Sequence, residues 1–317
     1  MQIYRLSDCR GNENRSFAPV DTIPTGSAVV LGFFDGVHLG HAELIRSAKK
    51  YADEHRTSVT VWTFESMPKA EKVITTPDEK ISVLSSLGVD YALLEDFFEV
   101  QEMTPDTFFD DYLIKKLAPS ALFFGFNFRY GKNAAGGAGT LAESAKAHGI
   151  ESFTMPPYEK NGLVVSSSRI RSLILDGKLD EANALLMHPY SVSGKVMRGN
   201  RIGHTIGFPT LNLRLPKEKI PAKNGVYASI AIIDGKRYKA VSNLGSRPTV
   251  NGDTNDVTLE THIFDFEREF YGDRLTVEFI SFIRKEKRFS SVDELSAQIV
   301  IDSNKAKELL LQKNKNT

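Results

Sequence analysis

Two histidines and three glycines stand close together near the start of the chain. His38 and His41 are three residues apart, and Gly32, Gly36 and Gly40 surround them. An imidazole N–H can donate to a phosphate oxygen, and glycine lets the backbone approach such a ligand closely. The group therefore favours phosphate binding, although two bare histidines more often belong to an ordinary loop and helix cap.

This group lies between an expected strand and an expected helix. The apolar run 28–31 ends at the first glycine, and residues 42–51 have the pattern of a helix. A strand, a glycine turn and a helix direct backbone N–H groups and the positive end of the helix dipole to one point. That arrangement suits an anion.

Composition limits the class of protein. The 317 residues are enough for about two domains, and 41% of them are hydrophobic. Forty basic residues balance forty acidic ones, so bulk binding to nucleic acid or to an anionic membrane has no support. No apolar run is long enough to span a membrane, no signal-peptide core opens the chain, and the single Cys9 excludes a disulfide framework. We therefore expect a cytoplasmic protein.

The first half of the chain alternates between strand-like and helix-like stretches. Strand patterns occur at 28–31, 58–64, 89–94, 121–125 and 150–154. Helical patterns fall between them, two of which open at Thr76 and Thr104, each followed by proline. The alternation predicts a doubly wound parallel sheet of Rossmann-like type. Ligands of such sheets bind beyond the carboxyl ends of the strands, where the histidine group is expected.

The pattern changes near residue 187. Strand-like runs then follow one another without helices, at 190–196, 226–233, 237–242, 257–264 and 275–283. A single helix, opened by Ser291, is expected at 291–310. These patterns predict an antiparallel β-barrel with a terminal helix. The two domains are therefore predicted as residues 1–187 and 188–317.

Two further stretches of the first domain have residue types suited to ligand binding. Residues 124–131 mix aromatics, an amide and an arginine at the end of an expected strand. Residues 165–171 lead a cluster of hydroxyls into a helix with two arginines, which suits a polyphosphate. The alternatives are a core edge with a solvated arginine, and an ordinary N-cap with solvated arginines.

The second domain contains a glycine-rich loop, residues 199–212, that ends in Pro-Thr-x-Asn. Thr210 and Asn212 share one face of an extended segment and could offer neutral oxygens to a magnesium ion that carries phosphates. The glycines alone indicate only a barrel loop. Glu260 lies within an expected strand, where a lone glutamate is usually solvated, so spacing assigns it no role.

Taken together, these stretches resemble the bifunctional prokaryotic FAD synthetases, in which a riboflavin kinase is joined to an FMN adenylyltransferase. The family's motifs are matched over nearly the whole chain, at residues 32–41, 125–131, 166–171, 203–212, 225–227, 243–249 and 283–289. The histidine motif of the first domain also occurs in other nucleotidyltransferases. The kinase motifs, in this order and behind that domain, are highly specific.

The resemblance implies two reactions. Riboflavin takes the γ-phosphoryl group of ATP at the second domain, and the resulting FMN attacks the α-phosphorus of another ATP at the first domain, giving FAD and pyrophosphate. His38 and His41 would hold the ATP phosphates and stabilise the leaving pyrophosphate. The other residues implied in ATP binding at the first domain are Gly32, Phe33, Asp35, Gly36, Gly40, Asn127, Ser167, Ser168, Arg169 and Arg171.

For the kinase, the resemblance implies that Glu260 is the base that takes the proton from the ribityl hydroxyl of riboflavin. Arg284 and Phe289 would contact the flavin. Thr210 and Asn212 would bind Mg²⁺ as well as ATP. The residues implied in binding ATP–magnesium are Gly203, Thr205, Gly207, Pro209, Thr210 and Asn212.

One departure from the family pattern leaves alternatives open. Many members carry T-F-x-P-H-P after the second strand, whereas residues 63–68 read T-F-E-S-M-P and lack the histidine. A bifunctional FAD synthetase is the main interpretation. The alternatives are a riboflavin kinase that has lost most adenylyl transfer, and a non-catalytic flavin or nucleotide sensor. The intact Thr210, Asn212 and Glu260 argue against the sensor.

Overall fold

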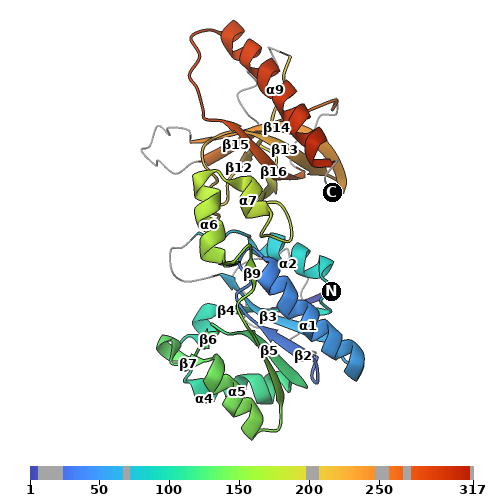
Figure 1. Cartoon of the computed structure of the whole chain (residues 1–317), viewed down its shortest axis with the longest axis vertical. Helices are drawn as coiled ribbons and strands as arrows, with labels where there is room; N and C mark the ends of the chain where they lie inside the picture. The colour runs from blue at the N-terminus through green and yellow to red at the C-terminus, as the bar shows by residue number, and fades with distance from the viewer. Residues whose placement is uncertain (6–23, 67–71, 198–206, 247–256, 267–272, 315–317) are drawn as a thin grey trace. The chain divides into compact units, whose positions relative to one another are not determined.

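A computed structural model of the chain describes residues 1–5, 24–66, 72–197, 207–246, 257–266 and 273–314. The chain divides into two compact units (Figure 1): residues 1–71 with 77–166, and residues 72–76 with 167–317. Residues 167–187 therefore pack with the second unit. The boundary between the functional domains at residue 187 stays a prediction.

The first unit is built on a six-stranded parallel sheet with the order β1-β4-β3-β2-β5-β8. Its strands are β1 (Gln2–Arg5), β2 (Ala28–Leu31), β3 (Val59–Ser66), β4 (Tyr91–Asp96), β5 (Ala121–Gly125) and β8 (Glu151–Met155). All four residues of β2 are buried, as a continuous apolar run in a central parallel strand predicts. Five strands confirm the prediction, and the edge strand β1 adds a sixth.

Helices cover both faces of this sheet. The larger ones are α1 (Leu39–His55), α2 (Pro77–Ser86), the π-helix η2 (Phe108–Leu117) and α5 (Ala138–Ala147). Phe123 of β5 meets Tyr51 of α1, with ring centroids 5.7 Å apart, whereas the next residue, Phe124, packs in one core with η2 and α5. Since successive strand residues point to opposite faces, α1 lies on one face and η2 and α5 lie on the other. The doubly wound arrangement is therefore confirmed.

Short elements complete the first unit. Helix α4 begins at the predicted cap, because the hydroxyl of Thr104 accepts from the backbone N–H of Thr107 at 3.1 Å. The short elements are α3 (Phe97–Val100), α4 (Pro105–Thr107), β6 (Arg129–Tyr130), η3 (Lys132–Ala134), β7 (Gly136–Gly137), β9 (Glu159–Lys160) and β10 (Leu163–Val164).

The second unit is a nearly closed antiparallel barrel with the order β11-β16-β13-β14-β15-β12. Its strands are β11 (Ser191–Lys195), β12 (Leu211–Arg214), β13 (Gly225–Ile233), β14 (Lys236–Ser246), β15 (Val257–Ile263) and β16 (Arg274–Arg284). The backbone N–H of Met197 donates to the carbonyl of Asn212 at 2.9 Å, which links the chain after β11 to β12. The predicted barrel is confirmed, and β12 is a strand that the pattern did not predict.

Among the described residues, the barrel is accompanied by α6 (Ser167–Asp176), α7 (Leu179–Asn183) and the terminal α9 (Val292–Asn314). Figure 1 shows α9 lying across β13, β14 and β16. Ala306 and Leu310 of α9 share a core with Val226 and Val241 of the barrel. The predicted terminal helix is confirmed, and Ser291 caps it by accepting from the backbone N–H of Glu294 at 3.1 Å.

A short piece from the first half of the sequence belongs to the second unit. Val73 pairs in parallel with Lys219, and its carbonyl accepts from the N–H of Ile220 at 2.8 Å. The buried Nζ of Lys219 donates to the carbonyl of Ile74 at 2.7 Å and lies 5.0 Å from the ring centroid of Tyr190. Both units are therefore discontinuous in sequence.

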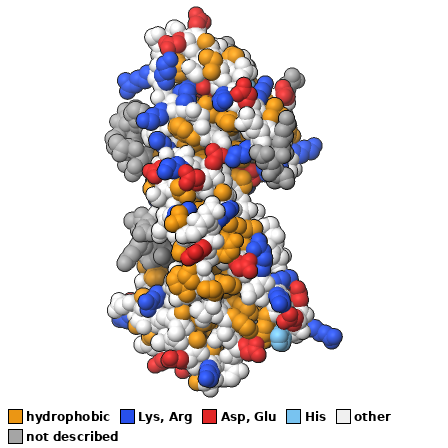
Figure 2. Space-filling view, viewed as in Figure 1, with side chains coloured by type: hydrophobic (Ala, Val, Ile, Leu, Met, Phe, Trp, Pro, Cys, Tyr) orange, Lys and Arg blue, Asp and Glu red, His pale blue; other side chains and the backbone are white. Residues whose placement is uncertain are grey.

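The visible surface matches the balanced composition. Figure 2 shows basic and acidic side chains interspersed over the face in view. Within the described ranges, no helix is both long enough and apolar enough to cross a membrane.

Candidate active sites

The turn between β2 and α1 brings the two predicted histidines into contact. The backbone N–H of each donates to Nδ1 of the other at 3.3 Å, and His38 is the N-cap of α1. The rings stack with centroids 3.6 Å apart at an angle of 14°. Because both Nδ1 atoms accept, the hydrogen bonds assign the ring proton of each to Nε2. Two neighbouring N–H donors therefore stand at the positive end of α1.

Both histidines are neutral at pH 7. Burial lowers the pKa of His38 to about 4. Burial also lowers the pKa of His41 well below its usual value, and the nearby His38 and Lys80 contribute in the same direction. The two rings can therefore donate directed hydrogen bonds, but they carry no fixed positive charge.

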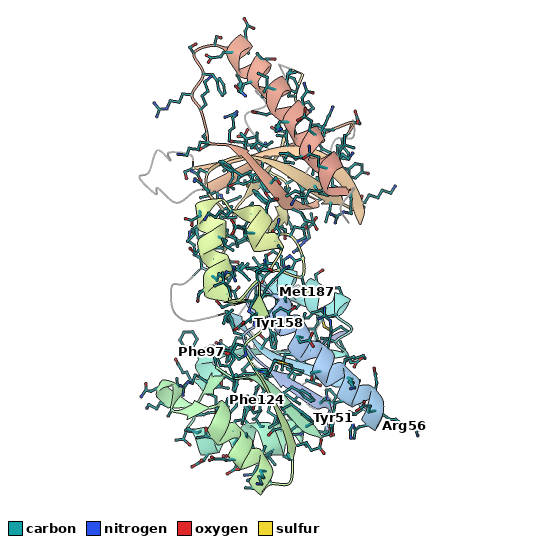
Figure 3. All side chains as sticks on the ribbon, viewed as in Figure 1. Tyr51, Arg56, Phe97, Phe124, Tyr158 and Met187 are labelled. Carbon is teal, nitrogen blue, oxygen red and sulfur yellow. The ribbon has the colours of Figure 1, made fainter. Side chains whose placement is uncertain are left out.

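Two of the predicted glycines have a conformation or surroundings that disfavour a side chain. Gly36 has a φ of 81°, a left-handed conformation that favours glycine. A Cβ on Gly40 would lie 3.2 Å from Cβ of Tyr158 and 3.3 Å from the ring of His38. In Figure 3, Tyr158 and Phe97 lie toward the carboxyl ends of the strands. Arg56, the C-cap of α1, lies at the opposite end of the sheet. The predicted turn thus lies where a ligand of this sheet is expected.

Lys80 of α2 is a residue of this site that the sequence did not reveal. Its side chain is 2% exposed, and its Nζ donates to the carbonyls of Phe33 at 2.8 Å and Phe64 at 2.9 Å, and to Oγ1 of Thr63 at 3.3 Å. Burial lowers the pKa of Lys80 to about 7, and the buried carboxylate of Asp35 acts in the opposite direction. A lysine in an amphipathic helix usually faces solvent, so no pattern distinguishes this one.

An aromatic cavity of about 600 Å³ lies next to the turn. Its walls include Trp62, Phe64, Phe97, Phe108, Phe128, Arg129 and Tyr130. Phe64 joins the cavity to the turn, because its ring centroid lies 6.4 Å from that of Phe33. Flat aromatic walls with a few polar groups suit a planar ring system. The predicted Asn127 is exposed, just before the wall residues Phe128 and Arg129.

A buried polar network lies behind the Trp62 wall of this cavity. Nε1 of Trp62 donates to the hydroxyl oxygen of Tyr112 at 3.0 Å, and that hydroxyl donates to the carboxylate of Glu95. Burial raises the pKa of Glu95, while its bond with Tyr112 opposes this. The network fixes the rotamer of Trp62, whose ring forms part of the wall.

The predicted hydroxyl and arginine cluster occupies the start of α6. The residues in its first turns are Ser167, Ser168, Arg169 and Arg171. The N–H groups of a first helical turn have no partner within the helix, as the predicted anion site requires. Helix α6 belongs to the second compact unit, so its convergence with the histidines on one polyphosphate stays a prediction.

A second cavity, of about 250 Å³, gathers the predicted kinase residues in the barrel. Thr210, Glu260, Arg284 and Phe289 all line it. Asn212 is paired with Glu260 in the register of β12 and β15, and Asn243 is paired with it across β14 and β15. Directly paired residues share a face of an antiparallel sheet, so the amides and the carboxylate form one row.

Gly207 and Pro209, which are also predicted in the kinase site, lie just before β12. Gly207 has a φ of 80°, and the carbonyl of Pro209 is hydrogen-bonded to Nδ1 of His262 at 2.9 Å. Nδ2 of Asn212 donates to the carbonyl of Thr210 at 3.4 Å, so the side-chain oxygen Oδ1 of Asn212 points away from that carbonyl. Gly203 and Thr205 lie outside the described residues.

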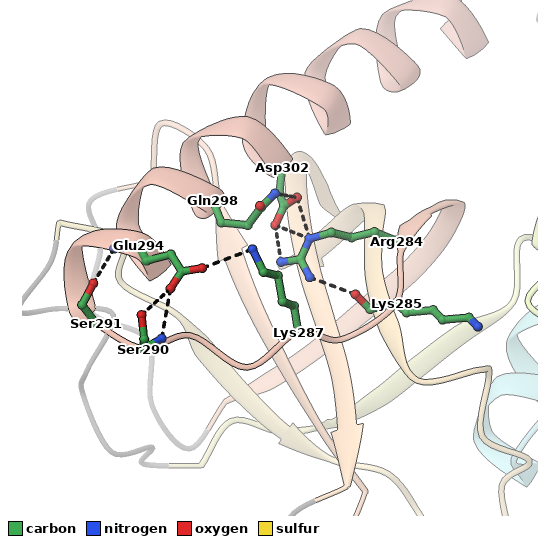
Figure 4. A network of polar contacts seen from close by, with 8 residues as sticks. All are labelled: Arg284, Lys285, Lys287, Ser290, Ser291, Glu294, Gln298 and Asp302. Carbon is green, nitrogen blue, oxygen red and sulfur yellow. Dashed lines mark hydrogen bonds and ion pairs between the residues drawn. The ribbon is translucent and has the colours of Figure 1, made fainter.

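Arg284 is bonded to the terminal helix (Figure 4). Its Nε and Nη2 donate to the carboxylate of Asp302 at 2.9 and 2.6 Å, and its Nη1 donates to the carbonyl of Lys285 at 2.9 Å. Gln298 also donates to Asp302, at 3.0 Å. These bonds fix the wall of the cavity, and the ring of Phe289 lies 5.8 Å from the guanidinium. The flavin contact of Arg284 stays a prediction.

The segment after Arg284 is tied to the start of α9. The carboxylate of Glu294 accepts from the backbone N–H of Ser290 at 3.0 Å and its hydroxyl at 2.8 Å, and pairs with Lys287 at 3.2 Å. These bonds lower the pKa of Glu294 to about 2, and the hydrogen bond from the backbone N–H of Ser290 has the largest effect. The segment that carries Phe289 is thus held at both ends.

Two family models match the chain. A model described as FAD synthetase matches residues 20–169, and one described as riboflavin kinase matches residues 186–310. The bifunctional riboflavin kinase/FMN adenylyltransferase of Escherichia coli (strain K12) is 35% identical over 308 residues, which cover 94% of this chain and 96% of that protein. The protein of that name from Bacillus subtilis (strain 168) is 35% identical over 291 residues, with 88% and 91% covered.

A solved structure has the same fold over most of the chain. It is the crystal structure of a Streptococcus pneumoniae chain described as a macrolide-efflux protein. The two superpose with a TM-score of 0.80 at 34% identity, covering 91% of this chain and 96% of that one. The parallel sheet, the barrel and the terminal helix are therefore found together in a known protein.

Proposed function

Because the chain belongs to the bifunctional riboflavin kinase/FMN adenylyltransferase family, we propose that each of the two described sites carries out one of its two reactions. The chain phosphorylates riboflavin with ATP to give FMN, and it adenylylates FMN with ATP to give FAD and pyrophosphate. Matches to both family models favour this bifunctional reading over a kinase alone or a sensor.

Adenylyl transfer is assigned to the first unit. The isoalloxazine ring of FMN would lie in the aromatic cavity, and the phosphates of ATP would lie at the turn between β2 and α1. There, the Nε2–H groups of His38 and His41 would donate to the phosphates and to the pyrophosphate as it leaves. Transfer of this kind depends on positioning and charge stabilisation, so no covalent nucleophile is needed. The contact between Phe33 and Phe64 supports this assignment, because it joins the two substrate positions.

Phosphorylation of riboflavin is assigned to the barrel. Riboflavin would lie in the cavity between the barrel and α9, with Phe289 against its ring. Glu260 would take the proton from the ribityl hydroxyl as the oxygen attacks the γ-phosphorus. A general base of this kind typically contributes 10²- to 10⁴-fold to the rate.

Thr210 and Asn212 would hold Mg²⁺ together with the ATP phosphates. Among the residues that the structure describes, no group of three or more His, Cys, Asp or Glu side chains could hold a metal ion. The hydroxyl and amide oxygens of Thr210 and Asn212 fit a magnesium ion that keeps phosphate oxygens and waters as its other ligands. When bound, Mg²⁺ would neutralise charge on the phosphates. Both reactions consume ATP, which supports a cytoplasmic location.

The observation that carries this assignment is the separation of the two groups: the histidine pair lies in one compact unit and Glu260 in the other. The test is to incubate the protein with riboflavin, ATP and Mg²⁺ and to resolve FMN from FAD by chromatography. His41→Ala should reduce FAD formation by about 10²- to 10³-fold and leave FMN formation unchanged. Lys50→Ala, at an exposed position of α1, is the matched control. Equal loss of both products in His41→Ala would refute the assignment of sites to units.

A further inference from the structure

Lys80 connects the two halves of the adenylyl-transfer site. Its Nζ donates to the carbonyl of Phe33, in the phosphate-binding turn, and to the carbonyl of Phe64, at the carboxyl end of β3. The ring of Phe64 lines the aromatic cavity. One buried ammonium group therefore joins the backbone of the turn to the backbone of the cavity wall.

The hydrogen-bond partners of this nitrogen favour the protonated form. Its third partner is Oγ1 of Thr63, at 3.3 Å, and the hydroxyl of Thr63 itself donates to the carbonyl of Phe33 at 2.9 Å. All three partners of Lys80 therefore accept, and only an ammonium group has three N–H donors. Burial holds the pKa of Lys80 near 7, opposed by Asp35, and the neighbouring histidine, His41, is neutral.

The bond to Phe33 also orients a peptide group of the turn. The C=O and N–H of a trans peptide point in opposite directions, so a Phe33 carbonyl turned to Lys80 directs the N–H of Phe34 to the other side. Phe34 and Val37 have φ values of 54° and 41°, which are unfavourable for residues with bulky or branched side chains. Such a backbone persists only where its surroundings hold it.

We propose that Lys80 is a positioning residue for adenylyl transfer: it sets the spacing between the phosphate-binding turn and the aromatic cavity, and so aligns FMN with the α-phosphorus of ATP. This inference rests on the proposed assignment of the two sites. Lys80 acts through Phe33 and Phe64 and does not touch either substrate. Alignment matters strongly in such a reaction, because a displacement of about 1 Å can reduce the rate by about 10²-fold.

Lys80→Met tests the proposal, because methionine fills a similar volume and has no N–H donor. The kcat of FAD formation from supplied FMN should fall by about 10²-fold, while the KM values for FMN and ATP change by less than about fivefold. The phosphorylation of riboflavin should stay unchanged. Lys50→Met, at an exposed position, is the matched control. A folded Lys80→Met variant with an unchanged kcat would overturn the proposal.

Fluorescence shows whether the first unit is folded in each variant. Trp62 is the only tryptophan of the chain and is buried in that unit. A cooperative unfolding transition of its emission therefore identifies a folded variant. If Lys80→Met does not fold, Thr63 gives the decisive measurement, because it touches the same ammonium group.

Thr63→Val removes the hydroxyl and keeps the shape of the side chain. The kcat of FAD formation should fall by at least about tenfold, because the hydroxyl accepts from Lys80 and donates to Phe33, and Thr63→Ser should restore it. A purely structural hydroxyl would lower the unfolding temperature without this selective loss of kcat. Wild-type kcat in Thr63→Val would overturn the proposal. A wild-type protein that forms FMN but no FAD would instead refute the proposed function of the first unit.

Discussion

Replacing His38 by asparagine should separate the two roles of this side chain. Nδ1 of His38 accepts the backbone N–H of His41 and so caps α1. In the proposed mechanism, its Nε2–H would donate to a phosphate. Asparagine is among the preferred N-cap residues, and its Oδ1 can accept the same N–H. It places no donor where Nε2–H stands. Alanine removes both groups, so His38→Ala and His38→Asn differ only in the cap.

The two roles have different expected magnitudes. Loss of an N-cap costs about 1 kcal/mol, which lowers the unfolding temperature of a unit of about 150 residues by roughly 2–4 °C. Loss of one preorganised donor to a developing anion reduces kcat by about 10²- to 10³-fold, or about 2.7–4 kcal/mol. His38→Ala should therefore show both effects, and His38→Asn should show only the loss of kcat.

The assay combines Trp62 fluorescence during heating with the rate of FAD formation from supplied FMN. Riboflavin phosphorylation in the same preparation is the internal control, because it depends on the other unit. Wild-type FAD formation by His38→Asn would refute the catalytic role of the Nε2–H donor. An unchanged unfolding temperature in His38→Ala would refute the capping role.

Three further predictions concern the base, the cavity wall and pH. Glu260→Gln should reduce FMN formation by about 10²- to 10⁴-fold and leave FAD formation from supplied FMN unchanged, as both product assays would show. Asp302→Ala leaves the half-buried Arg284 without its carboxylate, so chemical denaturation should show a loss of about 3 kcal/mol in the second unit, and the KM for riboflavin should rise. Because burial lowers the pKa of His38 to about 4, the folded state binds fewer protons than the unfolded state between pH 6.5 and 4. Trp62 fluorescence should therefore show the first unit losing stability as pH falls through that window, with about 3 kcal/mol of the loss from His38, and losing less in His38→Asn.

Most of the fold follows from local patterns in the sequence. The apolar run of β2, the threonine cap at Thr104 and the serine cap at Ser291 each specify an element that the structure contains. Strand β12 was not predicted because its short run directly follows a glycine-rich loop, whereas the equally short β2 is uniformly apolar. Its pairing with β15 depends on contacts between residues far apart in sequence, which periodicity does not record.

The candidate sites were predictable to the extent that they are local. His38 and His41 lie three residues apart between a glycine turn and a helix, which favoured a phosphate site, and the structure stacks their rings 3.6 Å apart. The aromatic cavity and Lys80 were missed, because their parts come from separate segments that meet only after the sheet has formed. The kinase residues were identified by family resemblance, and the strand register then explains why Asn212 and Glu260 form one row.

The segment 72–76 determines where this chain can be cut. A fragment that begins at residue 167 contains α6, α7 and every strand of the barrel but lacks Val73 and Ile74, which pair with residues 218–220. The buried ammonium of Lys219 would lose the carbonyl of Ile74 as an acceptor and would have to be partly rehydrated. An independent kinase fragment therefore has to carry residues 72–76 on a linker, or replace Lys219 by an apolar residue such as methionine.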